Sequence, residues 1–221
     1  MPTGNSAKTP EFSKQRAAIW PIHGYELKKF VPLCLVMFFV LFNYTLLRNM
    51  KDSLVVSAVG PAVLSSLKLY VVAPMAIFFV VLYVKLANIF SREALFAGII
   101  AIFVAFFLAF GFIIYPNIEM FHPTLESVEH LKQLYPRFQA IIPVWGVWTY
   151  SIFYTLSELW GSVMLSFLFW QFANEVVKTE EAKRFYSLFG LGANVSLLFA
   201  GTIGKKLSKI GDSLPNGVDA W

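Results

Sequence analysis

An unbroken apolar run over residues 140–177 restricts the fold more than any other feature, because Glu158 and Glu175 are its only charged residues. A helix of that composition is long enough to cross the hydrocarbon core of a bilayer. A carboxylate near the middle of a bilayer costs roughly 2.5 to 3.5 kcal/mol, so it is retained where it faces protein or a water-filled cavity. Glu158 therefore indicates a polar pathway of the kind that transporters have.

The composition extends this interpretation to the whole chain. Hydrophobic residues make up 57% of the sequence and charged residues only 14%, whereas a soluble domain has about 25% charged residues. Several further apolar runs are close to the roughly 20 residues that a transmembrane helix needs. Their hydrophobicity is continuous, which argues against the alternating pattern of a membrane β-barrel. We predict an all-α membrane protein, a polytopic bundle of about five transmembrane helices in a lipid bilayer.

The charges between the apolar runs predict the orientation of this bundle. Lysine and arginine are in excess in residues 1–29 and 85–93, so both segments are expected on the cytoplasmic side, and residues 115–139, with a short amphipathic helix, are expected outside. The expected helices cover residues 30–47, 66–86, 94–114, the part of 140–177 from about Trp145, and 185–203. The expected domains are a tail over 1–29, a helical bundle over 30–204 and a polar loop over 205–221.

Two helix boundaries have alternatives. The first helix could end at Leu47 or continue to about Val59, just before a glycine–proline pair at 60–61 that predicts a turn. Residues 140–177 could contain one tilted helix or two short segments that break near 161–162. We prefer one helix, because no proline or charged loop separates the two halves.

The end of the chain raises two further points. Alternation of five helices would place Lys205, Lys206 and Lys209 outside, against the positive-inside rule. Either function retains them there, or the helix count is off by one. The sequence stops in a polar segment after an odd number of helices. We therefore expect these residues to be the N-terminal part of a longer protein that does not transport alone.

Charged residues are rare in the apolar helices, and five of them are candidates for a binding site: Arg48, Lys51, Asp52, Lys68 and Glu158. If the first helix takes its longer form, the first three lie inside the membrane, with Arg48 and Asp52 as i,i+4 partners; otherwise they cap the helix at the outer interface. Lys68, near the outer end of the second helix, fits a snorkelling interface lysine better than a ligand.

Two interpretations of the buried charges compete. Cations in a low-dielectric cavity bind phosphate groups strongly, which suits a carrier of a charged solute. An ion pair between Lys51 and Glu158 would instead be structural. Both interpretations hold if the substrate competes for the pair.

Motifs of enzymes and of cofactor sites are absent from the sequence. A phosphate-binding P-loop would need glycine at Phe199, and residues 190–192 lack the third glycine of a dinucleotide fingerprint. His122 and His130 do not have the spacing of metal ligands, and the single cysteine, Cys34, supports neither a disulfide nor a metal site. The net charge of +5 reports loop orientation rather than nucleic-acid binding. We expect no enzymatic activity, no cofactor, no metal and no nucleic-acid partner.

The apolar helices also carry longer motifs that resemble a known family, the non-mitochondrial ATP/ADP translocases of obligate intracellular bacteria and plastids. Together these motifs cover the chain from about residue 20 to 200, in the order that the family has. The matching stretches are 20–22 (WPI), 25–29 (YELKK), 42–52 (FNYTLLRNMKD), 68–74 (KLYVVAP), 82–93 (LYVKLANIFSRE), 157–175 (SELWGSVMLSFLFWQFANE) and 181–194 (EAKRFYSLFGLGAN).

The resemblance implies a major-facilitator-like fold of about twelve helices in two halves, of which this chain would be roughly the first five. It also implies exchange of internal ADP, or another nucleotide, for external ATP. The transport-critical charges of the family fall on Lys51 and Glu158, and further ones would lie in the missing C-terminal half. The expected location is the inner membrane of an intracellular bacterium or the inner envelope of a plastid.

Two departures from the family pattern concern the specificity. The motif LRNMKD has asparagine and methionine where the family often has LRDTKD, and SSLK at 65–68 stands where a Pro-Phe-Ile-Lys run is common. Members of the family carry different nucleotides, so GTP, CTP, UTP or their diphosphates, with or without proton coupling, are alternative substrates. A membrane fragment that transports nothing is the other alternative.

Overall fold

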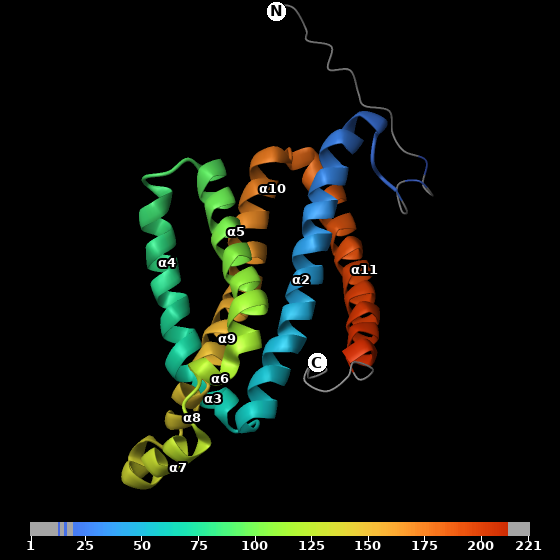
Figure 1. Ribbon diagram of the computed structural model, residues 1–221. Coiled ribbons are helices and arrows are strands. Elements are labelled where there is room, and N and C mark those ends of the chain that lie inside the picture. Colours follow the sequence, from blue (N-terminus) through green and yellow to red (C-terminus); the bar gives the residue numbers. More distant parts are fainter. Residues whose placement is uncertain (1–12, 14–15, 17–19, 212–221) are drawn as a thin grey trace, which may run out of the picture.

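The computed structural model describes residues 13, 16 and 20–211, without the side chains at 166, 167 and 207–211. Within this part the chain is predominantly helical and has no strand. Five helical spans are long and apolar enough to cross a membrane, which confirms the predicted polytopic all-α bundle (Figure 1). The spans are Gly24–Val59, Val63–Ala87, Arg92–Phe121, Trp148–Val176 and Thr179–Lys206.

The first span takes the longer of its two predicted forms. A 3-10 turn, η1 (Gly24–Glu26), leads into α2 (Leu27–Val59), whose 33 residues give a helix of about 50 Å. No glycine or proline interrupts it beyond Pro32 in its second turn. The helix ends at Gly60, which adopts a φ of 82° that other residues avoid. Residues 48–52 therefore lie inside the helix rather than at its cap.

The second and third spans each contain a wider, π-helical turn. The second consists of α3 (Val63–Leu67), η2 (Lys68–Val72) and α4 (Ala73–Ala87). The third consists of α5 (Arg92–Ala109), η3 (Phe110–Ile114), η4 (Tyr115–Asn117) and α6 (Ile118–Phe121). Short π-helical stretches are often found at functional sites, and η2 begins at a candidate site residue, Lys68.

The fourth span settles the alternative over residues 140–177. A short helix, α8 (Ile142–Gly146), comes first, and Val147 separates it from the membrane span. The span itself consists of α9 (Trp148–Gly161), η6 (Ser162–Phe169) and α10 (Trp170–Val176). These three elements form one continuous helix, which confirms the preferred prediction. At the position of the predicted alternative break, the helix widens into a π-helical stretch and continues.

The fifth span is longer than predicted. Helix α11 (Thr179–Gly211) begins six residues before the expected start at 185 and includes residues 205–211 of the expected polar loop; the rest of that loop lies outside the described residues. The C-terminal end of α11, the helix that contains Lys205 and Lys206, lies at the end of the bundle opposite the start of α2 (Figure 1). The described part contains five spans, as expected, so the departure of these lysines from the positive-inside rule stands.

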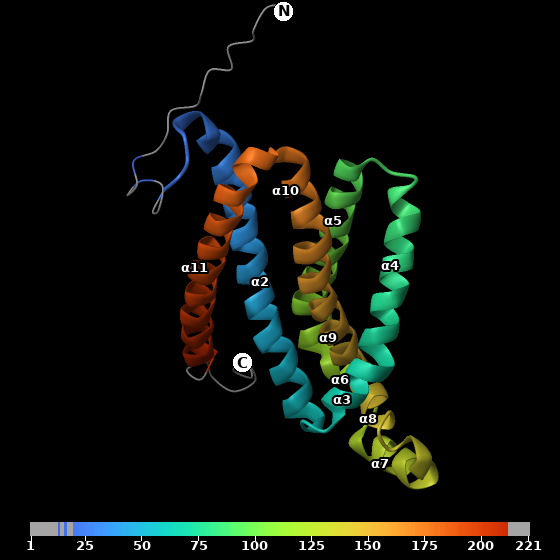
Figure 2. The same cartoon turned by 180° about the vertical axis from the view of Figure 1, so that it is seen from behind.

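The segment between the third and fourth spans contains the predicted amphipathic helix. This helix, α7 (Leu125–Leu134), is capped by Thr124, whose hydroxyl accepts a hydrogen bond from the Ser127 backbone N–H. A 3-10 turn, η5 (Pro136–Phe138), follows it. Figure 2 shows α7 projecting from the end of the bundle that also holds the Gly60 turn.

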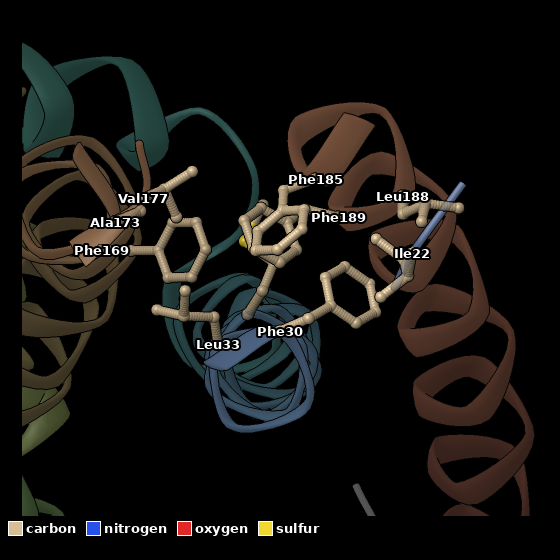
Figure 3. Close-up of a cluster of buried hydrophobic side chains, with 10 residues drawn as sticks. Ile22, Phe30, Leu33, Phe169, Ala173, Val177, Phe185, Leu188 and Phe189 are labelled. Carbon is tan, nitrogen blue, oxygen red and sulfur yellow. The ribbon is translucent and has the colours of Figure 1, made fainter. Parts of the chain in front are cut away.

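Helix α2 lies at the centre of the bundle, between α11 on one side and α9 on the other. Where α2, α10 and α11 meet, apolar side chains form a closed cluster, in which Phe30 stacks on Phe189 with ring centroids 5.5 Å apart (Figure 3). Arg184 donates to Glu26 at 2.7 Å beside this cluster, and Lys29 to Glu181 at 2.8 Å. Two motifs from opposite ends of the sequence thus bind each other.

On its other face, α2 approaches α9 at a glycine. The Tyr44 ring lies so close to Gly161 that a methyl group added there would overlap it. The glycine of the ELWGS motif is therefore required for this close approach of the two helices. Small residues serve this purpose generally at helix contacts in membranes.

We predict that Gly161→Ala destabilises the protein by about 1–3 kcal/mol, the usual penalty for overpacking. Gly190→Ala is the matched control, because a methyl group at Gly190 meets nothing within 4 Å, and alanine is the better helix former. The measurement is the thermal unfolding midpoint in detergent. Equal midpoints for the two variants would contradict the close contact between Gly161 and Tyr44.

The basic residues predict the orientation in the membrane. The end of the bundle that holds residues 20–26 and the loop at 88–91 carries many of the cations of the described part: Lys28, Lys29, Lys85, Arg92, Lys178, Lys183 and Arg184. We expect this end to face the cytoplasm. In a Cys34→Ala background, a membrane-impermeant thiol reagent should label Glu126→Cys and not Asn88→Cys in intact cells. Labelling of Asn88→Cys alone would reverse the orientation.

Candidate functional site

Lys51 is the centre of the candidate site, because the fold buries it in the interior of the bundle. Its side chain is only 2% exposed. The ammonium Nζ lies 2.7 Å from Oδ1 of Asp52 and 3.2 Å from Oε1 of Glu158. It also lies 3.9 Å from the centroid of the Tyr154 ring. The structure therefore brings together three of the five predicted residues.

The packing of α2 against α9 creates this arrangement. Lys51 and Val55 are one helical turn apart on α2, and both are buried on the face that meets α9. Tyr154 and Glu158 are likewise one turn apart on α9, so their side chains lie on the same face. The Lys51 side chain thus enters between a ring and a carboxylate of the neighbouring helix.

The three charges differ strongly in their exposure. The side chain of Asp52 is 44% exposed and that of Glu158 26%, against 2% for Lys51. A buried ammonium is stable only when opposite charges compensate it. Both carboxylates supply this compensation while keeping one side accessible. The carboxylates are thus the part of this triad that is exposed on the surface of the described bundle.

The other two candidates lie outside this triad. Arg48 is exposed, and within the described part of the chain it forms no ion pair with Asp52 at 4.0 Å or less. The expected i,i+4 pair between them was therefore wrong. Asp52 pairs with Lys51 instead, because the buried ammonium has the greater need of a counterion.

Lys68 is also exposed, at the start of η2. It lies close enough to Tyr154 to act electrostatically on the tyrosine hydroxyl, as do Asp52 and Glu158. Lys68 thus belongs to the electrostatic surroundings of the triad, although it comes from another span. Over the five residues predicted for the site, the charges leave an excess of one positive.

Tyr154 is a site residue that the sequence analysis missed. It is fully buried, and its ring lies beneath the Lys51 ammonium, a cation–π arrangement. The available signal was its spacing of four residues before Glu158, which places both on one helix face. In a helix rich in aromatic residues, that spacing alone did not single it out.

His122, which the sequence analysis did not expect to bind a metal, has a packing environment of its own. Its Nε2 lies 2.6 Å from the Thr149 hydroxyl, and its ring packs edge-on against Tyr150. Burial lowers the pKa of His122 below its ordinary value. In the described residues, no group of three or more potential metal ligands is found.

Comparison with known proteins places the chain among membrane carriers. A family model described as "TLC ATP/ADP transporter" matches residues 5–221. The chain is 49% identical to ADP,ATP carrier protein 1 of Rickettsia bellii, over 84% of this chain and 37% of that protein. It is 48% identical to ADP,ATP carrier protein 1 of Chlamydia muridarum, over 95% and 40% respectively.

A plastid protein gives a similar match. The plastidic ATP/ADP-transporter of Solanum tuberosum is 49% identical, over 94% of this chain and 33% of that protein. The chain thus spans about two fifths or less of the length of these relatives. No solved structure matches, so the major-facilitator-like architecture stays a prediction.

The burial of Lys51 predicts which charges the fold needs. The pair of changes Asp52→Asn and Glu158→Gln leaves an uncompensated buried cation, so we expect destabilisation of up to about 3 kcal/mol, less than for a fully enclosed pair because both carboxylates are partly exposed. Lys51→Met should be milder, since both carboxylates are partly exposed and less dependent on a counterion than the buried lysine. Adding Lys51→Met to the double variant should raise its unfolding midpoint in detergent. A triple variant no more stable than the double variant would contradict this.

Proposed function

Because the chain belongs to the TLC ATP/ADP transporter family, whose model matches residues 5–221, we propose that it is the N-terminal part of a nucleotide antiporter. This carrier exchanges external ATP for internal ADP by alternating access. The names of its relatives, ADP,ATP carrier protein 1 and plastidic ATP/ADP-transporter, support the substrate. The proposal assigns the protein to transport, and transport of this kind requires no enzymatic step on the nucleotide.

The observation that carries the proposal is the buried Lys51 ammonium with its two accessible carboxylates. An ammonium in a low-dielectric environment attracts phosphate oxygens strongly. In the absence of nucleotide, Asp52 and Glu158 neutralise it. A nucleotide phosphate that reaches the site replaces one or both carboxylates as the counterion of Lys51.

This exchange of counterions gives a physical reason for coupled exchange. A lysine between two carboxylates is stable without substrate, so the site need not collapse when the nucleotide leaves. The carboxylates released by an incoming phosphate become available to cations elsewhere in the protein. Glu158 comes from a different span than Lys51, so its release changes a contact between α2 and α9. We propose that this change biases the bundle between its inward-open and outward-open states.

Arg48, three residues before Lys51 on α2, and Lys68, which acts on Tyr154, provide additional positive charge near the triad. A nucleoside di- or triphosphate carries more negative charge than Lys51 alone can balance. Since the chain covers 37–40% of the bacterial relatives, we propose that the remaining part of the full-length carrier supplies further cations. Transporters of this type bind substrate near the midplane between two repeats. The missing C-terminal half is thus the proposed protein partner.

The relatives also support a location. Two of them come from Rickettsia and Chlamydia and one is named as plastidic. We propose the inner membrane of an intracellular bacterium, or the inner envelope of a plastid, for this multi-pass protein. Uptake of ATP from the surrounding compartment is the use that such a location suggests.

Other nucleotides are a second candidate class of substrate, on the basis of the departures at Asn49 and at 65–68. Asn49 and Ser65 are both exposed, whereas the partners of Lys51 are Asp52, Glu158 and Tyr154. We propose that these departures leave the partners of Lys51 unchanged and affect recognition of the rest of the nucleotide. Uptake of a panel of labelled ATP, GTP, CTP and UTP distinguishes the candidates.

For the full-length protein, we predict that Lys51→Gln abolishes nucleotide uptake mainly by weakening binding, because it removes the buried cation. Lys51→Arg should restore little, since a planar guanidinium does not replace a compact ammonium in a fitted site. Glu158→Gln should reduce exchange more than binding. The measurements are uptake into proteoliposomes and equilibrium binding of labelled ATP, each normalised to the inserted protein.

The matched control is Lys28→Gln, which removes a lysine from the exposed first turn of the same helix, α2. We expect it to leave uptake and binding unchanged. If well-inserted Lys51→Gln binds and exchanges ATP like the wild-type protein, Lys51 is not the phosphate-binding cation. Arg48 and Lys68 would then be tested in the same way.

A further inference from the structure

Tyr154 has an environment that a purely structural tyrosine does not need. Its ring is fully buried and packs in an apolar cluster with Val55 of α2, Leu67 of α3 and Val144 of α8. Three spans and a connecting helix therefore meet at this one side chain. Its face carries the Lys51 ammonium at 3.9 Å, which holds the lysine in place.

The hydroxyl at the end of this ring is buried and has no hydrogen-bond partner within the described residues. A buried polar group without a partner is destabilising, so such a group in a native protein calls for an explanation. The two carboxylates nearby, Asp52 and Glu158, are engaged with Lys51. Lys68 acts on the hydroxyl through its charge and as a weak hydrogen-bonding neighbour, but it does not meet the distance and angle of a hydrogen bond. A lysine can only donate to this oxygen, so the hydroxyl proton still has no acceptor.

The charges around this hydroxyl indicate what could bind it. The cations Lys51 and Lys68 belong to different spans, and both act at Tyr154. A phenolic O–H is a good donor to an anionic oxygen. Ser157 and Trp160 of α9 also carry buried donors without a partner in the described residues, but the Tyr154 ring is the one that contacts the Lys51 ammonium, so an anion that displaces the carboxylates from Lys51 arrives beside Tyr154. Among the anions that a nucleotide carrier meets, the phosphate chain of the nucleotide has the necessary charge and number of oxygens.

We infer that Tyr154 is a substrate-contacting residue, whose hydroxyl donates a hydrogen bond to a phosphate oxygen of the transported nucleotide between Lys51 and Lys68. This inference rests on the proposed function and extends it. The ring positions the lysine that attracts the phosphate, and the hydroxyl binds the phosphate itself. The unsatisfied hydroxyl of the substrate-free state then gains its partner when the nucleotide binds.

The test is Tyr154→Phe in the full-length protein. This change keeps the ring, its packing and its contact with Lys51, and removes only the hydroxyl. We expect the equilibrium affinity for ATP to fall about tenfold or more, as for the loss of a hydrogen bond to a charged group. The affinity for inorganic tripolyphosphate, measured by competition with labelled ATP, should fall by a similar factor, because the lost contact is to phosphate.

The matched control is Tyr83→Phe, which removes a tyrosine hydroxyl that bonds Gln171 at 2.5 Å, far along the chain from Lys51. It should leave both affinities unchanged. Two results would overturn the inference: a Tyr154→Phe protein that binds ATP like the wild type, or one in which ATP binding weakens and tripolyphosphate binding does not. A wild-type protein that binds ATP without displacement by tripolyphosphate would also overturn it. A wild-type protein that binds no nucleotide would refute the proposed function instead.

Discussion

A buried ammonium within a membrane-spanning helix is the constraint on which the rest of this structure depends. Lys51 lies inside the bundle, where its charge is tolerable only beside opposite charge. Asp52 supplies one counterion from the same helix, and Glu158 supplies the other from α9. The position of α9 against α2 is therefore an electrostatic requirement as well as a packing arrangement.

Packing serves this requirement at several points along α2. Gly161 lets the Tyr44 ring lie directly against α9, which brings the two helices close enough for Lys51 to meet Glu158. On its opposite side, α2 is held to α11 by an aromatic cluster and by the ion pairs of Glu26 and Lys29. The central helix is thus fixed on both sides, while the carboxylates of the triad stay partly exposed. This combination suits a site that must exchange ligands within a stable bundle.

The sequence motifs acquire separate physical roles in this arrangement. The stretch 42–52 contributes Tyr44 and the Lys51–Asp52 pair, and the stretch 157–175 contributes Glu158 and Gly161. The stretches near residues 20–29 and 181–194 form the clamp between α2 and α11. The first two motifs build the candidate site, and the last two secure the helix that carries it.

The sequence by itself determined the number of spans, the helical class and the candidate charges, because apolar length and the penalty on intramembrane charge are local properties. It left open whether α2 continued past Leu47, since helix-compatible residues with charged side chains suit both a cap and a buried segment. Only the tertiary structure decided that Asp52 pairs with Lys51 rather than Arg48, and that Tyr154 lies beneath the ammonium. Those contacts depend on the rotation and distance of α9 relative to α2, which no spacing within one helix specifies.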